Sequence, residues 1–358
     1  VLRDQRFAKD ARNVFSAEEL AQWFPVSQQA AQREPGAYFM NRHMLSADPP
    51  DHTRLRALVN LSFTPRLVEQ WRARIQAITD ELIDAVEAQG KMELIDSFAF
   101  PLPLAVITEM LGVPPEDRLA FRKWSNTVVE ASGNPAMFTR VRADMQAFGM
   151  YLHTLISEKR QQPAEDLLSK LIQAEEEGET LAENELISMV FLLLIAGHET
   201  TVNLIGNGML ALLEHPDQME KLRQDPELIK TAIEEFLRYQ SPVMTATQRW
   251  ARQDLEFAGQ QMRRGDSVMV VLASANHDYE AFSEPDALDI TRPENRHLAF
   301  GKGIHYCLGA PLARLEGQIA IATLVRRLPN LRLDIAPEQL TWRPGMLLLG
   351  LHKLPVAF

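Results

Sequence analysis

The sequence predicts a mainly α-helical fold with a small β region. Apolar residues recur at the three- and four-residue spacing of amphipathic helices along most of the chain. One such pattern, Glu183–Glu214, corresponds to a helix of roughly 45–50 Å, long enough to cross the whole molecule. Short β-like runs are concentrated after residue 243. No linker rich in proline, glycine and serine divides the 358 residues, so we expect a single domain over residues 1–358.

Five helices are predicted before the long one, and several end at helix-breaking residues. In the first, residues 65–89, the apolar side chains share one face, and Gly90 suits its C-terminal end. Gly112 follows the second helix and Pro163 follows the fourth, as expected of helix stops. The other four helices are predicted over residues 100–111, 116–130, 139–161 and 165–175.

After the long helix, the composition changes from helical to mixed. The two helices that follow it each open with a proline, which is tolerated in the first turn, and Gly259 and Gly265 separate the β-like runs. The remaining predicted elements are helices over residues 216–224 and 226–239, β-like runs within 243–275, an irregular stretch over 276–298, a helix over Leu308–Leu328, and short strands near 331–335 and 346–351.

Composition and charge restrict the function. The formal net charge is −11, which argues against a nucleic-acid partner because such proteins present a basic face. A single cysteine cannot form an internal disulfide and is typical of a reducing compartment. The longest apolar run, residues 189–196, is far shorter than the roughly 20 residues of a membrane helix. The charged N-terminal segment lacks the apolar core of a signal peptide. We therefore expect a cytoplasmic protein with no membrane association.

The single cysteine, Cys307, lies in the segment AFGKGIHYCLGAPLAR, residues 299–314. A lone cysteine is most often a small buried hydrophobic residue. Here, however, Gly301, Gly303 and Gly309 permit backbone conformations and close approaches that a side chain would block. A thiolate just before the last predicted helix would be stabilised by the helix dipole and by nearby amides. Such amides also tune a metal bound to sulfur.

Other cysteine chemistries fit this segment less well. Tyr306 stands where a dinucleotide fingerprint has its third glycine. Zinc sites need several cysteine or histidine ligands at close spacing, and the sequence has no CxxC. His305 occupies the first glycine position of a nucleophile elbow. A thiolate ligand to haem requires one cysteine only, and a flat cofactor requires close approach of the backbone.

The pattern Phe300-x-x-Gly303-x-x-x-Cys307-x-Gly309 resembles the haem-binding signature of the cytochrome P450 family, in its soluble bacterial type. The resemblance extends over nearly the whole chain. It implies a cytochrome P450 fold with a long central helix over haem b (iron protoporphyrin IX), and Cys307 as the thiolate ligand of the iron. Family members carry some tens of residues, including a helix and two strands, before the segment resembling VLRDQRFAKD, so we expect those elements to be missing here.

A second motif, residues 196–201 (AGHETT), lies within the long helix. Its glycine could mark a helix end, or the motif could be a polar surface patch. Apolar flanks on both sides favour a buried position, where polar groups need partners, and Gly197 favours an opened helix with room for a small ligand. The family resemblance implies that Thr200 holds dioxygen and its ordered water, that Glu199 relays protons, and that Ala196 contacts the haem.

A third motif pairs Glu235 with Arg238, three residues apart on one helix face. Taken alone, this is most often an ordinary exposed ion pair. The resemblance implies that both residues meet Arg292, which precedes the cysteine loop, and that the three lock the segment carrying the cysteine. Leaving such charges buried and unpaired would be costly.

A fourth set of residues is implied to bind the haem propionates. His52 and Arg56 are four positions apart and share a helix face, whereas Arg249 and His305 lie in the β region and the cysteine loop. Each alone is more often a surface residue. A bidentate arginine suits a carboxylate.

Together these features predict a haem-thiolate monooxygenase that inserts one oxygen atom from O2 into a C–H bond or an alkene of an apolar small molecule. The substrate is expected to be a polyketide, macrolide, fatty acid or terpenoid. No flavin or nicotinamide site is visible, so electrons should come from a ferredoxin or flavodoxin with its reductase, and we expect a monomer. The alternatives are a non-catalytic haem-binding or sensor protein and a cysteine hydrolase.

We expect the substrate pocket to draw on five parts of the chain, which are residues 13–45, residues 124–150, Leu193 with Ala196, Val243–Thr247 and Leu347–Leu349.

Overall fold

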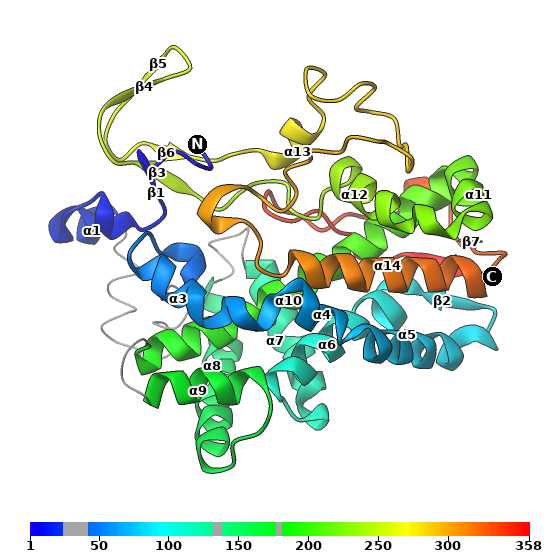
Figure 1. Cartoon of the computed structure of the whole chain (residues 1–358), viewed down its shortest axis with the longest axis horizontal. Helices are drawn as coiled ribbons and strands as arrows, with labels where there is room; N and C mark the ends of the chain where they lie inside the picture. Colours follow the sequence, from blue (N-terminus) through cyan, green and yellow to red (C-terminus); the bar gives the residue numbers. More distant parts are fainter. Residues whose placement is uncertain (24–41, 132–137, 177–180) are drawn as a thin grey trace.

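The computed structural model describes residues 1–23, 42–131, 138–176 and 181–358. It is mainly helical, with small antiparallel sheets at its edges, and this confirms the predicted fold class (Figure 1). The long helix α10 (Glu183–Glu214) runs through the middle. It packs against α6 (Pro101–Leu111), α12 (Ile229–Tyr239) and α14 (Ala310–Arg327), and in turn α14 packs on α5 (Arg72–Glu87).

Helix α10 begins and ends at the predicted residues, and apolar side chains cover it on nearly every side. It is the one helix in the described residues that is long and apolar enough to cross a membrane, but 78% of its apolar window is buried inside the molecule. A helix that is apolar all round is buried, and here the cover is protein. The remaining described helices are α1 (Ala17–Trp23), α3 (Asp51–Asn60), α4 (Pro65–Glu69), α7 (Arg118–Ala131), α8 (Phe138–Gln161), α9 (Leu167–Glu176), α11 (Pro216–Gln224) and α13 (Leu272–Asn276).

Several predicted boundaries need correction. The helix predicted over residues 65–89 is two helices, α4 and α5, separated at Gln70 and Trp71. The end of the last β-like run is helix α13, in which Leu272 and Asn276 are buried. Residues 346–351 form isolated bridges rather than a strand. The sequence patterns do not predict α1, and they predict α3 only through the shared helix face of His52 and Arg56.

Three small antiparallel sheets are present in the described residues, and each joins segments from different parts of the chain or closes a hairpin. In the first, Phe7 pairs with Ala251 and Arg249 pairs with Val268. In the second, Val356 pairs with both Met92 and Leu333. The sheets are β1 (Phe7–Ala8), β3 (Arg249–Ala251) and β6 (Ser267–Val268); β2 (Lys91–Glu93), β8 (Pro355–Ala357) and β7 (Arg332–Leu333); and the hairpin of β4 (Leu255–Phe257) and β5 (Gln260–Met262).

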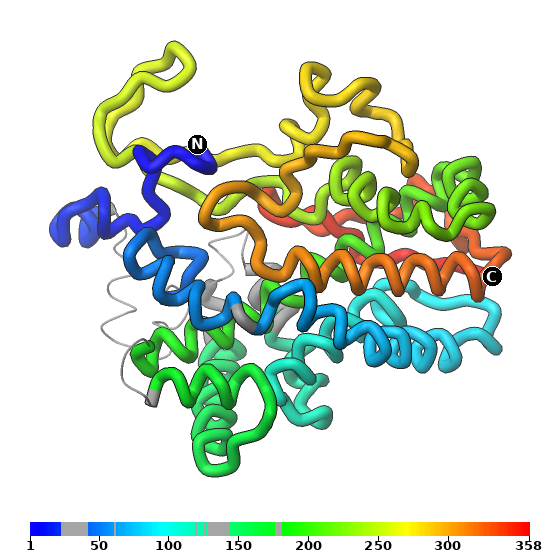
Figure 2. Tube along the Cα trace, in the orientation of Figure 1, coloured from blue at the N-terminus to red at the C-terminus, as the bar shows by residue number. Residues whose placement is uncertain are grey.

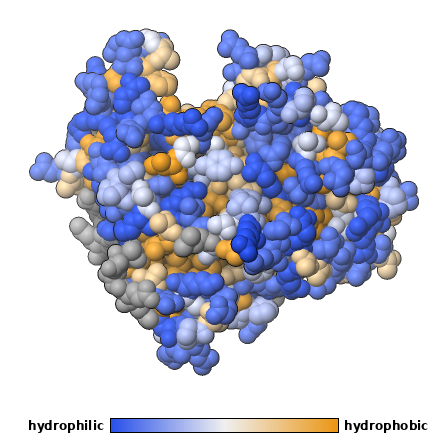
Figure 3. Space-filling view, viewed as in Figure 1, coloured by the Kyte–Doolittle hydropathy of each residue, from blue (hydrophilic) through white to orange (hydrophobic). Residues whose placement is uncertain are grey.

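The two termini lie far apart (Figure 2). The first sheet holds the start of the chain beside β3, whereas the amide of Phe358 donates to the carbonyl of Gly90, at 2.9 Å, after α5. Hydrophilic side chains cover most of the face in Figure 3, with smaller apolar patches between them. This distribution agrees with the charged composition of the chain.

Candidate active site

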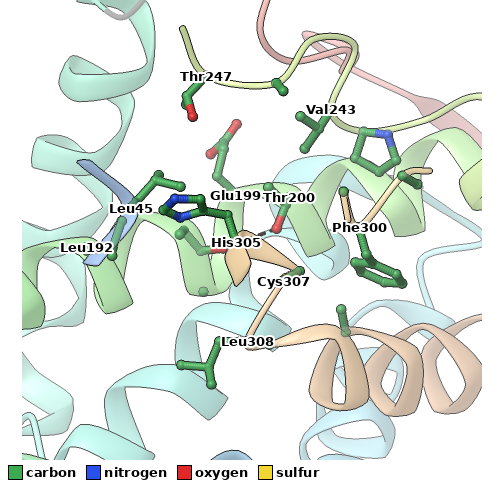
Figure 4. A pocket seen from close by; sticks show the side chains of 18 of the residues that line it. Leu45, Leu192, Glu199, Thr200, Val243, Thr247, Phe300, His305, Cys307 and Leu308 are labelled. Carbon is green, nitrogen blue, oxygen red and sulfur yellow. Dashed lines mark hydrogen bonds between the residues drawn. The ribbon is translucent and has the colours of Figure 1, made fainter. Parts of the chain in front are cut away.

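A cavity of about 390 Å³ lies between α10, the cysteine loop and the segment that leads into β3. Its walls are mostly apolar, with a few polar groups at defined places, as is typical of small-molecule sites. Figure 4 shows Thr200 on α10 and Cys307 on the loop before α14 lining this cavity together. Every residue predicted for the catalytic pair, the thiolate and the propionates lines it, whereas no described residue of 124–150 does.

Cys307 lies in a tight loop just before α14. Its amide donates to the carbonyl oxygen of Phe300 at 2.9 Å, and its carbonyl oxygen accepts from Ala310 at 3.5 Å. Gly303 has φ +81°, and a Cβ there would lie 2.6 Å from the carbonyl oxygen of Leu2. Both features require glycine at this position, so the loop keeps this shape only with a glycine at residue 303.

In the absence of a bound ligand, the environment of the thiol favours the neutral form. Burial raises the pKa of the Cys307 thiol. Backbone hydrogen bonds from Gly309 and Ala310, together with the charges of Arg56 and Arg314, oppose that shift and favour the thiolate. A Cβ at Gly309 would meet nothing within 4 Å, and because Gly309 lines the cavity, glycine leaves open space beside the sulfur.

Cationic side chains gather at one side of the cavity. His52 and Arg56 come from α3, Arg249 from β3 and His305 from the cysteine loop, and all line the cavity. The rings of His52 and His305 lie 4.4 Å apart. Burial, followed by the positive charges of His52, Lys9 and Arg249, lowers the pKa of His305 to about 3.

This cluster contains buried donors without partners. Nε2 of His52, Nη1 of Arg249 and Nε2 of His305 have no hydrogen-bond partner among the described residues. Buried polar atoms are almost always paired, so an unpaired arginine nitrogen and two unpaired histidine nitrogens around one cavity fit an anionic ligand that accepts hydrogen bonds. The carboxylates of a haem satisfy this requirement, and the thiol of Cys307 lines the same cavity. The residues present therefore fit a haem.

The motif on α10 presents five of its six residues to the cavity, all except His198. Ala196, Glu199 and Thr200 all line it, and the Thr200 hydroxyl donates to the carbonyl oxygen of Ala196 at 3.1 Å. Gly197 does not break α10, which is continuous from residue 183 to residue 214. Instead, a Cβ at Gly197 would lie 2.8 Å from Cγ1 of Ile107, so the glycine permits close packing against α6.

Glu235, Arg238 and Arg292 are brought together in a buried cluster. Nε and Nη2 of Arg238 each donate to Glu235 at 2.8 Å, and Nε of Arg292 donates to Glu235 Oε2 at 3.1 Å. Both arginines also donate to main-chain carbonyls of the segment before the cysteine loop, which are those of Asn276, Ser283, Glu284, Pro285 and Ala287.

Sequence reasoning missed several residues at this site. Lys9 donates to the carbonyl of Gln248 at 3.3 Å, and burial lowers its pKa to about 7. Arg343 forms an ion pair with Glu199. Glu316 on α14 is fully buried beside Thr201. No local pattern marks Lys9 or Arg343, because each meets the site only through long-range contacts. For Glu316, the charged residue within an otherwise apolar face of the last helix is a usable signal.

The model of the cytochrome P450 family matches residues 134–343. The polyketide biosynthesis cytochrome P450 PksS of Bacillus subtilis is 46% identical over 357 residues, which cover 99% of this chain and 85% of the relative. The chain belongs to the cytochrome P450 family. The cytochrome P450 monooxygenase PikC of Streptomyces venezuelae is also 46% identical, over 99% of this chain and 82% of the relative.

The fold agrees with solved cytochrome P450 structures. The myxobacterial cytochrome P450 CYP267B1, in complex with myristic acid, superposes with a TM-score of 0.93 at 45% identity, covering 100% of this chain and 87% of that one. This P450 is therefore an oxidoreductase of the monooxygenase type that uses a haem-thiolate cofactor, a substrate, O2 and redox partners. The catalytic interpretation holds over the non-catalytic haem-binding one, and the cysteine hydrolase alternative is wrong.

Proposed function

We propose that this P450 binds haem b through Cys307 and inserts one oxygen atom from O2 into an apolar small molecule of the polyketide, macrolide, fatty acid or terpenoid class. The observation that carries the proposal is that Cys307, the unpaired nitrogens of His52, Arg249 and His305, and Thr200 all line one cavity. A haem bound through a cysteine thiolate supplies the reductive activation of dioxygen, because the thiolate donates electron density that favours O–O cleavage.

Each predicted site residue has a proposed task. His52, Arg56, Arg249 and His305 pair with the haem propionates, which would satisfy the unpartnered donors. Gly309 allows the backbone to approach the cofactor, and Phe300 and Ala196 contact it. Gly303, which does not line the cavity, shapes the cysteine loop where it passes close to the carbonyl oxygen of Leu2. Glu235, Arg238 and Arg292 hold the chain before the cysteine loop.

Thr200 and Glu199 are proposed to manage protons. The Thr200 hydroxyl donates to the Ala196 carbonyl. The hydroxyl oxygen can therefore accept a hydrogen bond from the ordered water that accompanies dioxygen. The buried carboxyl of Glu199 lines the same cavity and relays protons to that water. General acid–base groups of this kind contribute typically about 10²–10⁴-fold in rate.

The proposed substrate class follows from the apolar walls and from the relatives. The apolar lining includes Leu45, Leu192, Val243, Leu347 and Leu348, and Figure 4 shows Leu45, Leu192 and Val243 around the cysteine loop. The names of relatives refer to polyketide biosynthesis, and the titles of similar structures to myristic acid and to tirandamycin C. Of residues 13–45, positions 24–41 lie outside the described residues.

We further propose a cytoplasmic monomer with a single haem-thiolate domain, reduced by a ferredoxin or flavodoxin with its reductase. We propose that the redox partner docks on the cysteine side, near residues 54–74 or Arg314. Arg54, Arg74 and Arg314 are engaged in ion pairs. Arg66 on α4 is exposed and has no ion-pair partner among the described residues, so it is the preferred contact for an acidic partner.

The test is spectroscopic and chemical. The reduced holoprotein exposed to carbon monoxide should show the red-shifted Soret band of a thiolate complex, and Cys307→Ser should lose it. With long-chain fatty acids and macrolactones as probes, ¹⁸O₂ should label the product. Thr200→Ala should still consume electrons but yield severalfold less product per electron pair, whereas Thr200→Ser should recover it. A wild-type protein without the thiolate band would overturn the proposal.

A further inference from the structure

Glu199 has an asymmetric environment. Its Oε1 accepts from Nη1 of Arg343, whereas its Oε2 is buried without a hydrogen-bond partner among the described residues. The Glu199 side chain is 1% exposed and that of Arg343 is 21% exposed. The ion pair therefore connects a buried acid of the cavity with the surface of the protein.

Arg343 is held in a defined position by the C-terminal hairpin, residues 341–352. The Arg343 amide donates to the Gly350 carbonyl at 2.8 Å, and that of His352 donates to the Thr341 carbonyl at 2.9 Å. Trp342 and Leu351 form a β-bridge next to these bonds. The main chain at Arg343 is thus fixed on both sides.

The C-terminal hairpin lies directly on α10. A Cβ at Gly350 would lie 2.0 Å from Oδ1 of Asn203, and Nδ2 of Asn207 donates to the carbonyl of Leu349 at 3.1 Å. Glu199, Asn203 and Asn207 are each four residues apart and therefore share one face of α10. Contacts at successive turns set the register of the hairpin on the helix, and this register brings Arg343 to Glu199.

The same hairpin forms part of the cavity wall. Leu347 and Leu348 line the cavity, Leu348 bridges to Val243, and the Leu347 carbonyl accepts from the amide of Met244 at 2.9 Å. The segment that bounds the substrate space and the segment that holds the acid are therefore one structural unit.

We propose that Arg343 is a positioning residue for Glu199. By holding Oε1, Arg343 leaves Oε2 as the atom that takes a proton from solvent and passes it to the water at Thr200. Glu199 lines the cavity and is almost fully buried, whereas Arg343 is partly exposed, so a proton reaches the acid along the arginine side without crossing the apolar substrate space. This inference rests on the proposed function of Glu199 as a proton relay.

The alternative is that the ion pair only stabilises the fold, since removing one partner of a buried pair is destabilising. The two roles give different measurements. A purely structural role lowers the unfolding temperature but leaves the ratio of product to electrons and the solvent isotope effect unchanged. A positioning role alters both, even where the protein remains folded.

The experiment compares Arg343→Gln, Arg343→Lys, Glu199→Gln and the double variant, with Arg332→Gln as a matched control on exposed β7. In the holoenzyme, product per electron pair and the rate in H2O and D2O are measured, together with the substrate dissociation constant and the carbon monoxide spectrum. Crystal structures of wild type and Arg343→Gln give the orientation of the Glu199 carboxylate independently of activity.

We expect Arg343→Gln to lower the product formed per electron pair about 5-fold or more and to raise the solvent isotope effect. Arg343→Lys should recover part of both. Because Arg343 and Glu199 act on one step, the effects of their substitutions should not add. The double variant should be no worse than Glu199→Gln, and the carboxylate should be reoriented in the crystal. Wild-type coupling, isotope effect and carboxylate orientation in Arg343→Gln would overturn the inference. If Arg343→Gln does not fold, the uncharged Arg343→Met takes its place, and wild-type values in that variant have the same consequence. A wild type without product would instead overturn the proposed function.

Discussion

Glu234 on α12 accepts two hydrogen bonds from Arg314 on α14, with separations of 2.6 Å for Nε–Oε1 and 2.8 Å for Nη2–Oε2. The Nε2 atom of His297 lies 3.0 Å from the same carboxylate. The guanidinium of Arg314 stands 4.6 Å from the centroid of the Phe300 ring. One carboxylate on α12 is thereby joined to the chain on both sides of the cysteine loop.

Glu234→Gln keeps the shape of this contact and removes its charge. We expect the free energy of unfolding of the holoprotein to fall by about 1.5–3 kcal/mol at pH 7, the range for hydrogen bonds to charged groups. Urea unfolding followed by circular dichroism measures this loss. The exposed Glu227→Gln, which removes a surface pair with Lys230, should cost less than about 1 kcal/mol; an equal loss in both variants would contradict the prediction.

The same contact has a pH signature. Burial alone would raise the pKa of Glu234, but hydrogen bonds from Arg314 and His297 outweigh burial and lower it to about 2, from an ordinary value of 4.5. A carboxylate with a lowered pKa stabilises the fold above pH 4.5, and this contribution is lost as the pH falls toward 2. The stability difference between wild type and Glu234→Gln should therefore be constant above pH 5 and shrink between pH 4.5 and 3.

Substitution of Arg249 tests whether the basic side chains at the cavity hold the haem. Its Nη1 is buried without a partner among the described residues, so a bound propionate would be its main interaction. We expect Arg249→Gln to accelerate loss of haem to apomyoglobin roughly 10-fold, which corresponds to about 1.4 kcal/mol. The matched variant Arg326→Gln, on the exposed side of α14, should leave the rate unchanged. Unaltered haem retention in Arg249→Gln would exclude the assigned role.

Glu316 predicts a pH dependence of the opposite sign. Burial raises its pKa from 4.5 to about 8, and the neighbouring Thr201 hydroxyl only partly opposes the shift. Between these values the folded protein keeps a proton that the unfolded chain releases, so stability falls as the pH rises, by at most about 1.4 kcal/mol per pH unit. In thermal unfolding at pH 5, 6.5 and 8, the unfolding temperature of Glu316→Gln should rise relative to that of wild type at each step in pH. As a control, the unfolding temperature of the exposed Glu338→Gln variant should change with pH in the same way as that of wild type.

Gly197 tests the packing of α10 on α6. Alanine is favoured over glycine by about 1 kcal/mol inside a helix, but its Cβ would lie 2.8 Å from Cγ1 and 3.0 Å from Cδ1 of Ile107. Overpacking of a core costs about 1–3 kcal/mol, so we expect Gly197→Ala to lower the free energy of unfolding. Ile107→Ala removes the clashing atoms, and the double variant should lose less stability than the sum of the single variants. If Gly197→Ala instead raised the free energy of unfolding, helix propensity would outweigh the close contact with Ile107 and the prediction would be wrong.

Local patterns in the sequence determined the helical fold class, the exact span of α10 and the composition of the cysteine loop. Apolar periodicity and helix-stop residues act over a few neighbouring positions, so they can be read without a structure. The same holds for the pairs at fixed spacing, Glu235 with Arg238 and His52 with Arg56, which share a helix face by geometry alone. Family resemblance then linked these separate patterns to one site.

The tertiary structure alone decided which distant groups meet. Lys9 reaches Gln248, and Arg343 reaches Glu199, across more than a hundred residues of chain, and no local spacing encodes such contacts. Tertiary packing also split residues 65–89 into two helices and gave Gly197 a packing role in place of a break. The physical reason is that burial and charge pairing depend on what the fold places opposite a residue, whereas periodicity records only which side of its own helix the residue occupies.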